Sequence, residues 1–273
     1  MRSYKTKNLE EIAREARICV LEMIYRTKGP HIGSSFSCIE ILVALYFKHM
    51  RVSEDAPQDP GRDRFVFSKG HACPALYAVL SLRGFLGSDK LCGFAVNDGC
   101  LQQHPDREVS LGIEVSTGSL GHGLSIACGM AYALKKDGSN SKVYVLLSDG
   151  ELHEGSTWEA AMFASQHKLD NIIAIVDYNK MQALGRGSDT LELEPLPEKW
   201  SAFGWQPVEV DGHDFLKLDK ALGPAHLRPG KPGILIAHTI KGKGVSFMEN
   251  QILWHYRCPD EAEYGKAMEE LSR

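Results

Sequence analysis

Two segments of the chain, residues 142–149 and 171–179, are apolar at nearly every position; they read KVYVLLSD and NIIAIVDYN. Continuous apolar runs of this length predict strands that are buried on both faces, as in a parallel sheet. Residues 155–169, which lie between them, have the pattern of a helix. Strand, helix and strand in this order predict a βαβ unit.

Other segments extend this alternation over most of the chain. We expect further strands over residues 64–68, 206–210 and 233–239, and further helices over residues 8–28, 36–49, 72–84, 118–136 and 260–272. The helix over 118–136 is expected to follow a glycine-rich turn, and residues 86–117 are expected to be irregular. Because no repeat or clear linker interrupts the pattern, we predict one α/β domain over residues 1–273, a parallel sheet flanked by helices on both faces.

Composition and charge exclude several classes of function. The chain has 273 residues, of which 43% are hydrophobic, and a net charge of −4. A chain without a broad basic surface is not expected to bind nucleic acid. No apolar run approaches the roughly 18–20 residues of a membrane span, so no membrane contact is expected. The N-terminal segment lacks the apolar core of a signal peptide, and the seven cysteines form no CxxC pair. We therefore expect a cytoplasmic protein with reduced thiols.

Polar side chains stand where the predicted strands end. Asp149-Gly150 follows the first strand, Asn179 ends the second, and His238 and Lys241 lie at the end of a third. Ligands bind at the carboxyl ends of parallel strands, and carboxylate and amide oxygens suit Mg²⁺ completed by water and phosphate. This interpretation predicts a metal-bridged diphosphate beside Gly150. The alternative is that Asp149-Gly150 is a surface turn and Asn179 a cap.

Glycines and histidines mark further candidate positions. Residues 117–123 read TGSLGHG, whose spacing GxxGxG differs from the dinucleotide pattern GxGxxG and which no apolar strand precedes. His31, His71 and His104 stand beside Gly or Pro at predicted junctions. A lone histidine is usually structural or solvated, but three in this setting favour a function. His153-Glu154 begins like the zinc motif HExxH, but Thr157 replaces its second histidine, so a zinc protease is rejected.

Taken together, these motifs resemble a known family. Asp149-Gly150 followed thirty residues later by Asn179 resembles the thiamine-diphosphate-binding motif. Over residues 8–258 the chain is similar to the N-terminal, diphosphate-binding half of transketolase. The segments that carry the resemblance read DRFVFSKGHACPALYAVL, EVSTGSLGHGLSIACGMAYA, DGELHEGSTWEAAMFASQHKLDNIIAIVDYN and HTIKGKGVSFMEN. The resemblance implies the thiamine-diphosphate-binding fold.

The resemblance also implies roles for particular residues. Those implied to bind Mg²⁺ (or Ca²⁺ or Mn²⁺) are Asp149, Asn179 and the carbonyl group of Met181. Those implied to line or contact thiamine diphosphate are Ser34, His71, Gly118, Ser119, Leu120, Gly150, Asn179, Lys241 and His255. Those implied to face the reacting sugar, as catalytic residues, are His31, His71, His104 and His255. Glu154 resembles an acidic residue at the contact between subunits.

The activity implied is the transfer of a two-carbon ketol unit from a ketose or its phosphate to an aldose or its phosphate. Thiamine diphosphate would serve as the carbanion sink, and histidines with pKa values near neutrality would shuttle protons. The alternatives are another thiamine-diphosphate carboligase, such as a deoxyxylulose-phosphate-synthase-like enzyme or a specialised pathway transferase, and a non-catalytic cofactor-binding subunit.

Transketolases carry a second, pyrimidine-binding domain, and we expect this chain to lack it. The resemblance therefore implies a split enzyme, with a separate C-terminal pyrimidine-binding subunit in an α₂β₂ assembly and an apolar patch for the partner to cover. Two positions depart from the family. Ser148 stands where Gly is usual, and Tyr256-Arg257 follows His255 where Gly commonly follows it.

Overall fold

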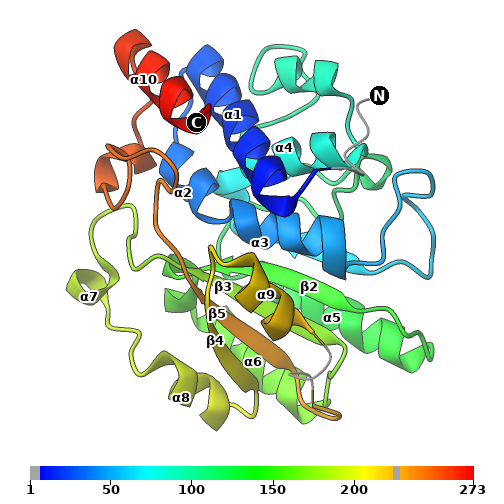
Figure 1. Cartoon of the computed structure of the whole chain (residues 1–273). Coiled ribbons are helices and arrows are strands. Elements are labelled where there is room, and N and C mark those ends of the chain that lie inside the picture. Colours follow the sequence, from blue (N-terminus) through cyan, green and yellow to red (C-terminus); the bar gives the residue numbers. More distant parts are fainter. Residues whose placement is uncertain (1–6, 224–227) are drawn as a thin grey trace.

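A computed structural model describes residues 7–223 and 228–273, and it centres on one parallel sheet (Figure 1). Its five strands lie in the order β1-β2-β3-β5-β4, and every neighbouring pair is parallel. The strands are β1 (Arg64–Phe67), β2 (Val143–Ser148), β3 (Ile172–Tyr178), β4 (Gln206–Asp211) and β5 (Gly233–His238). All five were expected, and the predicted α/β class is confirmed.

Helices cover both faces of this sheet, also as predicted (Figure 1). The helices of one face are α1 (Leu9–Thr27), α3 (Ile39–Ala44), α4 (Cys73–Arg83), α9 (Phe215–Leu222) and α10 (Glu261–Leu271). Those of the other are α5 (Gly123–Lys136), α6 (Gly155–Gln166) and α8 (Leu196–Ala202). Successive residues of β2 alternate between the two cores: Val143 and Val145 join one, and Tyr144 and Leu146 the other. This explains why β2 and β3 are apolar throughout.

The ends of the predicted helices follow local chemistry. Asn8 and Glu11 form a reciprocal capping box at the start of α1. Asp260 and Glu263 do the same for α10. Gly84 ends α4 with φ 97°, a conformation that glycine adopts without strain. Among the described residues, no helix is long and apolar enough to cross a membrane.

The helix predicted over residues 36–49 is largely confirmed, but the helical segment begins earlier and is broken at Cys38. The chain forms α2 (Ile32–Ser37), α3 and a π-helical turn over Leu45–His49. Gly and Ser residues make α2 a poor helix by propensity, so its buried position and not its sequence stabilises it. The short helices α7 (Gly187–Thr190), α8 and α9 and several 3₁₀ turns were also not predicted. Elements of this length carry too few apolar positions for a periodic signal.

The fully buried Trp200 anchors α8 to its face of the sheet. Its ring centroid lies 5.0 Å from those of both Trp158 and Trp205. We expect Trp200→Ala to lower the free energy of unfolding by about 3–5 kcal/mol, because it leaves a large cavity. Leu184→Ala is the control, since Leu184 is 89% exposed and its replacement should change little. Urea denaturation of both variants tests this, and similar small losses would contradict it.

Candidate active site at the carboxyl edge of the sheet

Asp149 lies directly after β2 and is almost completely buried. Its Oδ1 accepts a hydrogen bond from the backbone N–H of Gly150 at 2.8 Å, whereas its Oδ2 is buried and has no hydrogen-bond partner. Burial, together with the charge of Asp177, raises the pKa of Asp149 to about 6. A buried carboxylate oxygen without a donor is unfavourable, and a cation bound at this oxygen would compensate it.

Asn179 and Met181 follow the neighbouring strand β3, which pairs with β2 up to Ser148 and Asp177. Asn179 Oδ1 accepts from the Met181 N–H at 3.1 Å, and the Met181 carbonyl accepts from Lys241 Nζ at 3.2 Å. The part of the chain that the structure describes contains no group of three or more acidic, histidine or cysteine side chains that suits a metal. A cation here would therefore need further oxygens from water or phosphate, which is how Mg²⁺ is usually bound.

Four histidines gather beside these groups, from four separate segments. The ring centroid of His31 lies 5.3 Å from that of His71, 5.1 Å from that of His255 and 6.5 Å from that of His104. His31 has a left-handed backbone, with φ 74°, and its N–H donates to the His255 carbonyl at 2.9 Å. The structure thus brings together the four histidines that the sequence singles out.

Burial and nearby charges lower the pKa values of three of these imidazoles, those of His31, His71 and His255. Burial is the largest cause, followed for His31 by His104 and for His255 by Lys241, and the pKa values fall to about 4 and about 3 respectively. The pKa of His71 is also lowered, by burial and then by Lys69. The expectation of pKa values near neutrality therefore needs correction for these three residues. At neutral pH their rings are uncharged, and each has one nitrogen that accepts and one that donates.

Lys241 connects the histidines with the metal-ligand candidates. Its Nζ lies 2.9 Å from His255 Nδ1, and burial lowers the pKa of the amine to about 8. Ser34 Oγ lies 3.4 Å from the same His255 nitrogen. The side chain of Lys241 is only 1% exposed, so a cationic group stands at the bottom of the site, where an anion would be favoured.

A buried ion pair between Lys69 and Asp177 lies beneath the site. Lys69 Nζ also donates to the Ser34 carbonyl at 3.0 Å, and Asp177 accepts from the hydroxyls of Ser37 and Thr239. These bonds join β3 to α2 and to the segment after β5. Sequence reasoning did not assign this pair a role, although a charged Asp177 within an otherwise apolar strand was the available signal.

Ser148 has a structural explanation. Its hydroxyl accepts from the Glu151 N–H at 3.3 Å and closes the turn after β2. The buried Glu151 carboxylate in turn accepts from the Gly121 N–H at 2.9 Å and from the Ser68 hydroxyl. The side chain of Ser148 therefore fits the turn that carries Asp149 and Gly150.

Arg257, the second departure from the family, pairs with Glu263 of α10 at 2.5 Å.

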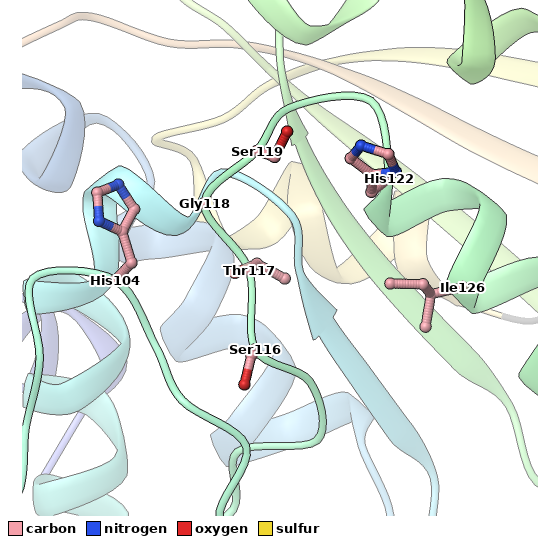
Figure 2. A pocket seen from close by; sticks show the side chains of 7 residues that line it. All are labelled: His104, Ser116, Thr117, Gly118, Ser119, His122 and Ile126. Atoms are coloured by element: carbon pink, nitrogen blue, oxygen red, sulfur yellow. The ribbon is translucent and has the colours of Figure 1, made fainter.

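His104 of the histidine cluster also lines a cavity of ≈ 600 Å³ (Figure 2). Its lining residues are His104, Ser116, Thr117, Gly118, Ser119, His122 and Ile126. Gly118 permits this arrangement, since a Cβ there would lie 3.0 Å from the His104 ring. Gly118, Ser119 and His104 were expected at the site, whereas Ser116, His122 and Ile126 were not. His122 lies within the glycine-rich motif of residues 117–123, which was its only sequence signal.

Other expected positions are peripheral in the structure or make other contacts. His238 pairs with Glu209 at 2.8 Å on an exposed part of β5 and is not in the histidine cluster. Glu154 is exposed where α6 begins. Leu120 is half-buried in the turn before α5. A Cβ added to Gly150 would lie 3.6 Å from Gln182, which is an ordinary contact, so the protein around Gly150 does not itself require a glycine.

Comparison with known proteins identifies the family to which this site belongs. The family model described as transketolase, thiamine diphosphate binding domain, matches residues 9–269. The chain therefore belongs to the transketolase family and has its thiamine-diphosphate-binding fold. The crystal structure of transketolase from Campylobacter jejuni is similar, with a TM-score of 0.90 and 32% identity. That match covers 97% of this chain and 42% of the C. jejuni chain, so the present chain spans less than half of that protein.

Some relatives have nearly the same length as this chain. One subunit of the apulose-4-phosphate transketolase of Phocaeicola vulgatus is 42% identical, over 98% of this chain and 95% of the relative. A 6-deoxy-6-sulfo-D-fructose transketolase subunit from a Clostridium species is 41% identical, over 97% of each. Human transketolase is 40% identical, over 92% of this chain but 40% of the human protein.

The Lys69–Asp177 pair generates a stability prediction. We expect Asp177→Asn or Lys69→Met alone to lower the free energy of unfolding by about 3–5 kcal/mol, because each leaves a buried charge unpaired. The double variant should lose less than the sum of the two. Asp170→Asn is the control, since it removes an ion pair with Lys135 whose side chains are 34% and 39% exposed, and it should cost under about 1 kcal/mol. If the double variant instead lost the sum of the two single-variant free energies of unfolding, the coupling between Lys69 and Asp177 would be contradicted.

Proposed function

We propose that this chain is the thiamine-diphosphate-binding subunit of a two-component transketolase. The enzyme would transfer a two-carbon ketol unit from a ketose or ketose phosphate to an aldose or aldose phosphate. The observation that carries the proposal is the buried, unpartnered oxygen of Asp149 at the end of β2, next to the end of β3 that carries Asn179. Lys241 joins this region to the four clustered histidines. Family membership and the nearly full-length similarity to transketolase subunits support it.

Asp149, Asn179 and the Met181 carbonyl would hold Mg²⁺, or Ca²⁺ or Mn²⁺ in its place. Lys241 and the backbone of Gly150 would help to hold the negatively charged diphosphate of the cofactor. The cofactor's other contacts would come from Ser34, His71, Gly118, Ser119, Leu120 and His255. When bound, thiamine diphosphate supplies the electron sink for cleaving and forming the carbon–carbon bond.

The four histidines would act on the hydroxyl and carbonyl oxygens of the sugar. A neutral imidazole can accept a proton at one nitrogen and donate one at the other, so a cluster can move protons without a net charge change. His31, His71 and His255 are held in this neutral form by burial. His104 lies at the rim, where it lines the cavity shown in Figure 2.

A separate pyrimidine-binding subunit would complete the active site, in an α₂β₂ assembly. The naming of nearly full-length relatives as transketolase subunits supports a separate partner. Met162 and Phe163 on α6 are 54% and 41% exposed, which suits a face that a partner covers, and Glu154 begins the same helix. We also propose a cytoplasmic location, which the seven free cysteines support.

The first test is reconstitution. We expect ketol transfer when the chain is mixed with a separately encoded pyrimidine-binding transketolase subunit from the same organism, thiamine diphosphate and Mg²⁺, and no transfer from either component alone. Coupled assays with a panel of ketose and aldose donors and acceptors, with and without phosphate, measure it. Activity of this chain alone would contradict the two-component proposal. Turnover of pyruvate would favour a synthase-like reaction, and cofactor binding without any turnover a non-catalytic subunit.

The second test concerns Asp149. We expect Asp149→Ala to abolish Mg²⁺-dependent binding of thiamine diphosphate in the reconstituted complex, measured by isothermal titration calorimetry. Without cofactor, the variant should be no less stable than the wild type, because it removes a buried, unsatisfied carboxylate oxygen. Asp137→Ala, which alters an exposed carboxylate after α5, is the matched control. Unchanged affinity in Asp149→Ala would mean that the metal assignment is wrong.

A further inference from the structure

A second buried charge network lies behind the site and shares no residue with it. Glu40 in α3 is 7% exposed, and both of its carboxylate oxygens lie 2.7 Å from Arg17 Nη2 in α1. The same carboxylate contacts His213 Nδ1 at 3.0 Å, from the loop between β4 and α9. Burying such charges is costly unless they are paired and their remaining polar atoms are hydrogen-bonded.

The network ends on the loop that carries Lys241. His213 Nε2 lies 2.8 Å from the backbone nitrogen of Ile240, and Arg17 Nε lies 2.8 Å from the Lys243 carbonyl. The backbone is therefore held on both sides of Lys241. A third bond runs from the Gly242 N–H to the Gly33 carbonyl at 3.0 Å, which joins the same loop to the helix that follows His31.

The direction of these bonds follows from their chemistry. A backbone N–H can only donate, so His213 Nε2 must be the unprotonated acceptor for Ile240. The ring proton is then on Nδ1, where it is donated to Glu40. Glu40 fixes the tautomer of His213, much as a carboxylate orients an imidazole in other sites. A simple tie between α1 and α3 would need Arg17 and Glu40 only, and neither His213 nor the bond to Lys243.

We propose that Arg17, Glu40 and His213 are positioning residues, which fix the backbone of residues 240–243 so that Lys241 Nζ reaches the Met181 carbonyl and His255. That Lys241 contributes to cofactor binding rests on the proposed function. That Arg17, Glu40 and His213 hold residues 240–243 in place does not. Lys241 has a long side chain that would otherwise sample many rotamers, and the loop has no regular secondary structure to restrain it.

Hydrogen exchange of the full-length chain tests the control of the loop directly. We expect His213→Leu to raise exchange rates across residues 240–243 roughly tenfold, because it leaves the Ile240 N–H without its acceptor. His213→Gln, whose side-chain oxygen can accept the same bond, should restore most of the protection. His238→Leu is the matched control, because it removes an exposed His–Glu pair near the same sheet edge. Exchange in β2 reports any global loss of stability.

Cofactor affinity tests whether the loop acts through Lys241. In the reconstituted complex with Mg²⁺, we expect His213→Leu to weaken thiamine diphosphate binding roughly tenfold. Lys241→Ala should weaken it at least as much, and the double variant should bind no more weakly than Lys241→Ala. If the affinity losses of the two single variants multiplied in the double variant, His213 would not act through Lys241.

The two measurements can refute the positioning role and the proposed function independently of each other. Unchanged exchange at residues 240–243 in His213→Leu would overturn the positioning role whatever the cofactor does. Altered exchange with full cofactor affinity would overturn the link between this loop and the diphosphate. If the wild-type complex itself binds no thiamine diphosphate, the proposed function fails, while the exchange data still decide whether His213 holds the loop.

Discussion

The site depends on charged side chains that lie at the end of a buried, apolar sheet. β2 and β3 are buried along their whole length, so the side chains that follow them enter a region where water cannot solvate charge freely. Lys69 compensates Asp177 there, and backbone and hydroxyl donors compensate Glu151. Of these three neighbouring carboxylates, only Asp149 keeps an oxygen without a donor. This contrast separates the structural groups from the one suited to bind a cation.

Much of the fold was predictable, because parallel strands buried on both faces have a distinctive sequence. β2, β3 and β5 are continuous apolar runs, and α1 and α10 carry capping residues at their first turns. The failures have physical causes. α2 consists of small and polar residues that are helical only because tertiary packing surrounds them. α8 and α9 are too short for periodicity to distinguish them from loops.

The residues of the site could be predicted from the sequence, but their pKa values could not. The resemblance to a family supplied His31, His71, His104 and His255, and the structure brings their rings together. Their lowered pKa values depend on burial and on nearby cations, which come from distant parts of the chain. For the same reason, no pattern in the sequence indicated that Glu40 and His213, which are 173 positions apart, meet behind Lys241.

The histidine cluster also bears on how the protein folds. His31 and His255 lie near opposite ends of the chain, yet a backbone bond joins them and their rings are in contact distance. Contacts of such long sequence separation carry a cost in chain entropy, because the loop between them must be closed, and they slow folding. A chain still emerging from the ribosome therefore cannot complete this cluster before residue 255 has been made. A probe placed on it would report when the two distant segments have met.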